Sequence, residues 1–120
     1  MIDHARREFP GEVCGFLAGR ENDVIRIYRM NNAEKDGMRY SIPLREQFDA
    51  VRDIRSRDLE IIGVYHSHPN ARPFPSSRDI RLALNPEYSY MIISITNGAP
   101  EIRSFKISGG VAQEEEIYVG

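Results

Sequence analysis

Two histidines, His66 and His68, stand one residue apart at the end of an apolar run, residues 61–65. The run predicts a buried strand, and Pro69 is expected to end it. Because side chains two positions apart on a strand point the same way, both imidazoles share one face and Ser67 points to the other. Two neutral imidazoles placed in this way form half of a site for zinc, copper, nickel or iron.

A carboxylate would complete a catalytic zinc site, which has three protein ligands and a water in the fourth position. Asp79 is the nearest candidate, beyond a loop rich in proline and serine. Ser76 and Asp79 also have the spacing of a helix capping box, which taken alone is the simpler interpretation. The two roles are compatible, because a carboxylate in the first turn of a helix is held in place, as a ligand must be.

Several neighbouring residues have ordinary structural interpretations. Glu12, just before an apolar segment, is in isolation an unremarkable exposed carboxylate. Cys14 is expected to be a small buried hydrophobic residue. A role as a nucleophile is disfavoured, because apolar surroundings raise the pKa of a thiol and the thiolate is the reactive form. Three arginines, at positions 72, 78 and 81, are better explained as a solvated surface than as a contact for an acidic partner.

Strands are expected where β-branched and aromatic residues gather or alternate with polar ones. These segments are 13–18, 24–30, 61–65, 88–96, 101–107 and 114–119, with a brief strand at 39–42. Turns are expected at 19–23 and at Asn97-Gly98.

Two or three helices are expected, one ahead of the first strand and the others between strands. The first covers residues 2–9, and the third covers 76–84. The second begins near Pro43 and carries one apolar face made by Leu44, Phe48, Val51 and Ile54. Strands interleaved with helices, with antiparallel hairpins at both ends, predict a mixed α/β sandwich around one sheet.

Length and composition restrict the classes of function. A chain of 120 residues fits one domain, and a net charge of −2 does not favour binding to nucleic acid. No apolar stretch is long enough to span a bilayer, and no signal peptide is visible, so no membrane partner is expected. A single cysteine excludes an internal disulfide and a four-cysteine zinc site, and it favours a cytoplasmic location.

Together these residues resemble the JAMM, or MPN-plus, metalloprotease family. Glu12 stands in GEVCGFLAG, the histidines stand in GVYHSHP, and SSRD follows after six residues. The family pattern is a glutamate after the first helix, His-x-His-Pro, a six-residue gap and Ser-x-x-Asp, and every position is matched. The similarity covers most of the chain and looks greatest to the small standalone prokaryotic members.

The resemblance implies one JAMM/MPN-plus domain over residues 1–120 with a mixed α/β, cytidine-deaminase-like fold. Such a fold has a central, mostly antiparallel curved sheet flanked by two or three helices. The resemblance also implies that His66, His68 and Asp79 bind Zn²⁺, with water as the fourth ligand. Glu12 would then act as the general base, and Ser76 would donate a hydrogen bond to the oxyanion.

The implied activity is hydrolysis of a peptide or isopeptide bond after the Gly-Gly tail of a ubiquitin-like or sulfur-carrier protein. A non-catalytic, protein-binding MPN scaffold is the alternative, although such relatives typically lack motif residues that this chain has. A zinc deaminase is disfavoured, because its His-x-Glu and Pro-Cys-x-x-Cys patterns are absent.

One departure from the family pattern concerns the start of the chain. Family members usually have a strand ahead of the first helix, whereas here the helix is expected to begin almost at Met1. Either the chain is shortened or one edge of the sheet is left open. An open edge could pair with another chain, which leaves a homo-oligomer as an option.

Overall fold

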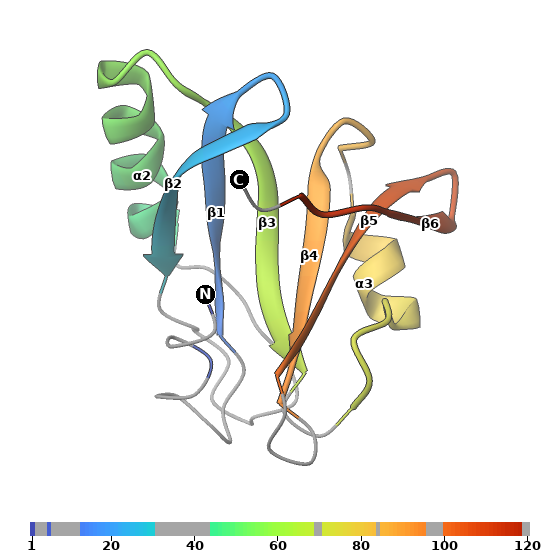
Figure 1. Ribbon diagram of the computed structural model, residues 1–120. Coiled ribbons are helices and arrows are strands. Elements are labelled where there is room, and N and C mark those ends of the chain that lie inside the picture. Colours follow the sequence, from blue (N-terminus) through green and yellow to red (C-terminus); the bar gives the residue numbers. More distant parts are fainter. Residues whose placement is uncertain are drawn as a thin grey trace.

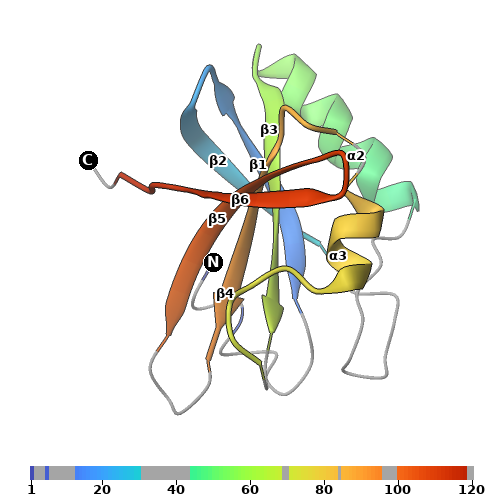
Figure 2. The same cartoon turned by 90° about the vertical axis from the view of Figure 1, so that its right-hand side faces the viewer.

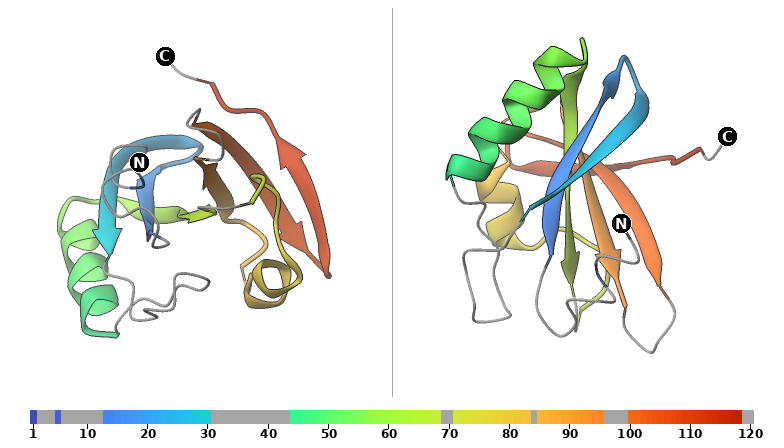
Figure 3. Two further views of the ribbon diagram at one scale, coloured as in Figure 1. Left: turned by 90° about the horizontal axis from the view of Figure 1, so that it is seen from below. Right: turned by 90° about the vertical axis from the view of Figure 1, so that its left-hand side faces the viewer.

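The computed structural model describes residues 1, 5, 13–30, 44–68, 71–83, 85–95 and 100–118. Six strands form one sheet in the order β2-β1-β3-β4-β5-β6. Two helices of the described part, α2 and α3, lie on one side of this curved sheet (Figures 1 and 3). The elements are β1 Cys14–Arg20, β2 Asp23–Met30, α2 Leu44–Ser56, β3 Glu60–His68, α3 Ser77–Leu82, β4 Ser89–Ser94, β5 Glu101–Ser108 and β6 Val111–Glu115.

The strand that carries the two histidines, β3, lies inside the sheet. It pairs antiparallel with β1 and parallel with β4, and β2, β5 and β6 extend the sheet by antiparallel pairs. A parallel pair needs a crossover connection, and α3 lies in the one between β3 and β4. The prediction of a mixed α/β fold built on one sheet is confirmed, and the crossover brings α3 back beside the end of β3 (Figure 2).

Hairpins close both ends of the sheet, as predicted. The turn between β1 and β2 contains Glu21, whose φ of 56° lies in the left-handed region. The turn between β5 and β6 uses Gly109 and Gly110, with φ of 58° and 79°. Two consecutive positive φ values suit a tight hairpin turn, so β6 starts immediately after it. The strand predicted over 114–119 was therefore placed too late, because β6 spans Val111–Glu115.

The apolar face predicted for the second helix is only partly correct. Ala50 and Ile54 are buried against β1, but Leu44 and Phe48 are 67% and 64% exposed. The hydroxyl of Tyr28 donates a hydrogen bond to Asp53, so α2 contacts the sheet through the face that carries residues 50, 53 and 54. That face is rotated away from the one that the hydrophobic spacing favoured.

The opposite face of the sheet has its own apolar cluster, in which helical Ala5 packs against Val13, Leu17, Tyr65 and Ile93. The remaining residues of the helix predicted over 2–9, the strand predicted at 39–42, Pro43 and the Asn97-Gly98 turn lie outside the described residues. Among the described helices, none has the length and apolar character needed to cross a membrane.

Candidate metal centre

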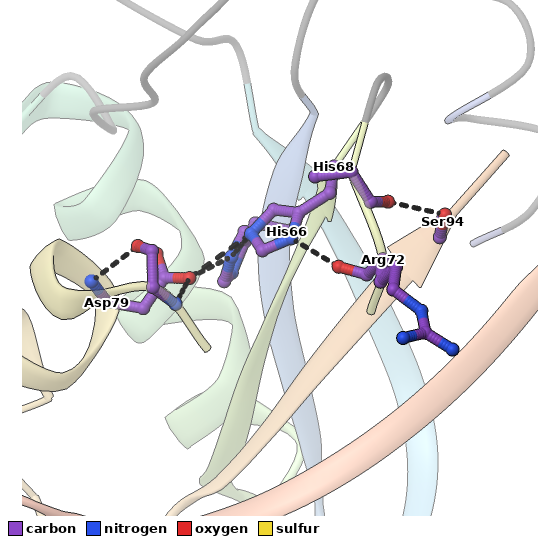
Figure 4. Close-up of polar contacts among 7 residues, drawn as sticks. His66, His68, Arg72, Asp79 and Ser94 are labelled. Carbon is purple, nitrogen blue, oxygen red and sulfur yellow. Dashed lines mark hydrogen bonds and ion pairs between the residues drawn. The ribbon is translucent and has the colours of Figure 1, made fainter. Parts of the chain in front are cut away.

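His66, His68 and Asp79 meet where the end of β3 faces the start of α3 (Figure 4). The two Nε2 atoms of His66 and His68 lie 3.1 Å apart. Oδ2 of Asp79 lies 3.1 Å from Nε2 of His68 and 3.3 Å from Nε2 of His66. The two histidines therefore lie on one face of β3, as predicted, and α3 supplies the carboxylate.

These separations fit a small tetrahedral cation. Donors held 2.0–2.1 Å from zinc at tetrahedral angles lie about 3.3 Å from one another. The three atoms of this chain form a triangle with sides of 3.1 to 3.3 Å. Two imidazoles and one carboxylate are also the type of ligand set that zinc enzymes use, so the residues present suit Zn²⁺ in both distance and chemistry.

Electrostatics keeps His66 and Asp79 in the protonation states that a metal ligand needs. Burial lowers the pKa of His66 and so favours its neutral imidazole. Burial alone raises the pKa of the Asp79 carboxyl, but its contacts with the His66 and His68 rings and with the backbone N–H of Ser76 more than offset this effect and hold the pKa well below its usual range. Asp79 is therefore ionised at neutral pH.

The ring of His68 is oriented by its second nitrogen. Nδ1 lies 3.0 Å from the carbonyl oxygen of Arg72 and donates to it, which directs Nε2 towards Asp79. The hydroxyl of Ser94, on β4, donates to the carbonyl of Ala71 at 2.7 Å and supports the same loop. The contact between His68 and the Arg72 carbonyl could not be predicted from the sequence, because any residue type can supply a backbone carbonyl. The pairing of His68 with Ser94 places Ser94 where it can hold the loop that carries this carbonyl.

The capping box predicted at Ser76 and Asp79 is present. The backbone N–H of Asp79 donates to Oγ of Ser76 at 3.1 Å, and the backbone N–H of Ser76 donates to Oδ2 of Asp79 at 2.8 Å. This Oδ2 is also the atom that faces both histidines. One carboxylate oxygen thus accepts the capping bond and also faces both histidines, while the Ser76 side chain is exposed beside it.

Ser67 faces away from the histidines, as predicted, and contacts the start of β1. Its Oγ accepts a hydrogen bond from the N–H of Val13 at 2.9 Å, and its own N–H donates to the Val13 carbonyl at 3.0 Å. Cys14 is buried in the apolar core directly across from His66, as expected for a small hydrophobe. Glu12 lies outside the described residues.

Comparison with known proteins agrees with this geometry. Residues 1–108 match the model of a family described as prokaryotic homologs of the JAB domain. The chain belongs to this family. The predicted resemblance to small prokaryotic JAMM/MPN-plus proteins is therefore confirmed.

Relatives of this JAB-family chain include a peptidase. This chain is 35% identical to the CysO-cysteine peptidase of Mycobacterium tuberculosis, over 99% of this chain and 84% of that protein. The chain is thus a homologue of a hydrolase.

Solved structures agree with the fold. A protein of Desulfitobacterium hafniense, solved in solution, is 40% identical, with a TM-score of 0.87 over 98% of this chain and 84% of the other. A JAB1/MPN domain protein of Archaeoglobus fulgidus is 16% identical, with a TM-score of 0.64 over 97% of this chain and 86% of the other, and it supports the fold alone.

Proposed function

We propose that the chain is a zinc-dependent peptidase or isopeptidase that cuts the amide after the C-terminal Gly-Gly of a sulfur-carrier or ubiquitin-like protein. The observation that carries this proposal is the convergence of His66, His68 and Asp79 at 3.1 to 3.3 Å. The name of the M. tuberculosis relative, CysO-cysteine peptidase, supports a sulfur-carrier substrate. The amine released would then be cysteine or a similar group.

Each proposed residue has a distinct task. His66, His68 and Asp79 hold the metal, and bound zinc supplies Lewis-acid chemistry by polarising the carbonyl and lowering the pKa of a water to about 7. Glu12 takes the proton of the attacking water and gives it to the leaving amine. The neighbour of Glu12, Val13, is hydrogen-bonded to Ser67, between the two histidines, which supports a place for Glu12 near them.

Ser76 is proposed to donate its hydroxyl proton to the oxyanion. Its Oγ already accepts from the N–H of Asp79, and a hydroxyl that accepts one hydrogen bond can still donate another. Ser76→Ala should therefore cost roughly 1 kcal/mol of folding stability through the lost cap. It should also lower kcat by roughly a hundredfold, as loss of an oxyanion donor does. Thermal unfolding and steady-state hydrolysis measure the two effects separately.

Ser77→Ala is the matched control, because Ser77 is an exposed serine in the first turn of the same helix. It should leave both stability and turnover close to the parent values. A Ser76→Ala protein that loses stability but keeps full turnover per folded molecule would leave Ser76 with a capping role only.

The substrate class is tested with a carrier protein that ends in Gly-Gly linked to cysteine. The zinc-reconstituted chain should release cysteine, and a chelator should stop the reaction. Replacing both glycines with valine should abolish cleavage, because a Gly-Gly backbone can approach the metal closely and a β-branched side chain cannot. Equal cleavage of the Gly-Gly and Val-Val carriers would reject this substrate class. Tight binding without cleavage would favour the scaffold alternative.

A further inference from the structure

The loop between β3 and α3 is bound to the candidate metal centre through its backbone. The carbonyl oxygen of Arg72 accepts one hydrogen bond from Nδ1 of His68 at 3.0 Å and another from the N–H of Phe74 at 2.8 Å. The preceding carbonyl, that of Ala71, accepts from the hydroxyl of Ser94 at 2.7 Å. The backbone of Arg72 is therefore fixed one imidazole ring away from the candidate ligand atoms (Figure 4).

An aromatic ring lies under the side chain of Arg72. The Cζ atom of Arg72 is 6.0 Å from the centroid of the Phe74 ring, which is within the range of a cation–π contact. The Phe74 ring is in turn held against the sheet, because its centroid lies 6.0 Å from that of Phe105 on β5. Phe74 nevertheless remains 43% exposed. The guanidinium of Arg72 thus rests on a supported ring at the surface of the protein.

The charge of Arg72 is available to a ligand. A second arginine, Arg103, also lies over Phe74, with its Cζ 5.1 Å from the ring centroid. Its guanidinium is held by Glu101 and Glu114 at 2.9 and 2.8 Å. Arg72 is exposed, as predicted, and no carboxylate of the described residues pairs with it. Of the two guanidinium groups on this ring, that of Arg72 can form a new ion pair without breaking an existing one.

The proposed substrate carries a group that matches this charge. A cysteine joined to the carrier through its amino group keeps its α-carboxylate, which a single carbon separates from the scissile nitrogen. A guanidinium binds a carboxylate through two parallel N–H···O bonds, a geometry that an ammonium group does not offer. Asp79 lies on one side of the histidine pair and Arg72 on the other (Figure 4). A carboxylate that extends towards Arg72 therefore also avoids the like charge of Asp79.

We propose that Arg72 determines specificity: its guanidinium binds the α-carboxylate of the amino acid that hydrolysis releases. This inference rests on the proposed function and narrows it. A single C-terminal amino acid has a free α-carboxylate beside the cleaved bond, whereas the lysine of an isopeptide bond and a longer C-terminal peptide do not. The chain is thus an exopeptidase that prefers conjugates of a carrier with one amino acid.

Two substrates isolate the contribution of the carboxylate. One is the Gly-Gly carrier linked to cysteine, and the other is the same carrier linked to cysteinamide, whose carboxamide is neutral. The zinc-reconstituted parent should cleave the acid with a kcat/KM at least roughly tenfold above that for the amide, as hydrogen bonds to a charged group allow. Arg72→Gln should cleave both substrates as the parent cleaves the amide. Arg72→Lys should keep part of the preference, because it keeps the charge without the planar fork.

Arg81→Gln is the matched control. Arg81 is an exposed arginine of α3 and stands two positions after Asp79, so it lies on a different side of the helix. This variant should keep the preference of the parent for the acid. If Arg72 only supports the loop that orients His68, Arg72→Gln should instead slow both substrates by the same factor and keep their ratio. That result would overturn the proposal, as would a parent that cleaves the two substrates equally well.

A binding measurement separates this proposal from the proposed function. If the zinc-loaded parent cleaves neither substrate, the proposed function fails, and the intact substrates then report binding to the same protein. Calorimetry should find that the parent binds the cysteine conjugate at least roughly tenfold more tightly than the cysteinamide conjugate. Arg72→Gln should bind the two equally. Equal affinities in the parent, or a preference that survives in Arg72→Gln, would overturn the role of Arg72.

Discussion

Replacing His66 and His68 together with alanine is expected to remove zinc from the protein and to abolish hydrolysis. The two Nε2 atoms lie 3.1 Å apart and supply two of the three donors, so the double variant keeps only the Asp79 carboxylate. A single carboxylate does not hold zinc in competition with water. Elemental analysis after reconstitution should find about one zinc per parent chain, as for a three-ligand site, and none in the variant.

Thermal unfolding gives an independent reading of the same prediction. Zinc that binds only the folded state raises Tm, so added zinc should stabilise the parent and not the double variant. Asp79→Asn is the graded control, since its amide oxygen can still accept the capping bond from Ser76 while the negative charge is lost. It should bind zinc more weakly than the parent. A double-histidine variant that binds zinc as tightly as the parent would place the site elsewhere.

The convergence of His66, His68 and Asp79 could be predicted because it depends on patterns between residues that are close in the sequence. Strand alternation sets the shared face of the histidines, and the capping box sets where α3 begins and where its carboxylate points. The capping and metal-ligand roles of Asp79 were compatible in the sequence, and in the structure a single oxygen of Asp79 accepts the capping bond and faces both histidines. Local patterns therefore identified most of the side chains that surround the candidate centre.

The contacts that support the centre could not be predicted, because they depend on the register between strands. The pairing of β3 with β4 brings Ser94 beside His68 and so to the loop that orients its ring. The pairing of β3 with β1 brings Ser67 to Val13. Hydrophobic spacing likewise favoured Phe48 as a core residue, but the Tyr28–Asp53 hydrogen bond fixes α2 on a different face. Residue spacing within one element carries no information on such pairings.

Glu12→Gln is expected to leave a folded protein that binds zinc and hydrolyses almost nothing. Glutamine keeps the shape and the hydrogen-bonding capacity of glutamate, but its amide cannot accept the proton of the attacking water. The loss in kcat should be at least roughly a hundredfold, as for removal of a general base. Zinc content, Tm and steady-state hydrolysis of the carrier–cysteine substrate should be measured on the same preparation, so that loss of chemistry is separated from loss of metal or fold.

Comparison with Asp79→Asn makes the Glu12 test decisive. A residue that only moves a proton should affect kcat and not zinc affinity, whereas a ligand should affect zinc affinity first. Glu12→Gln protein that cleaves at the parent rate with zinc bound would make Glu12 a surface residue and remove the general base from the mechanism. Glu12→Gln protein that loses zinc would make Glu12 a ligand, and the assignment of Asp79, 3.1 Å from His68, would have to be reconsidered. Retained zinc with lost turnover is the one result that supports both assignments.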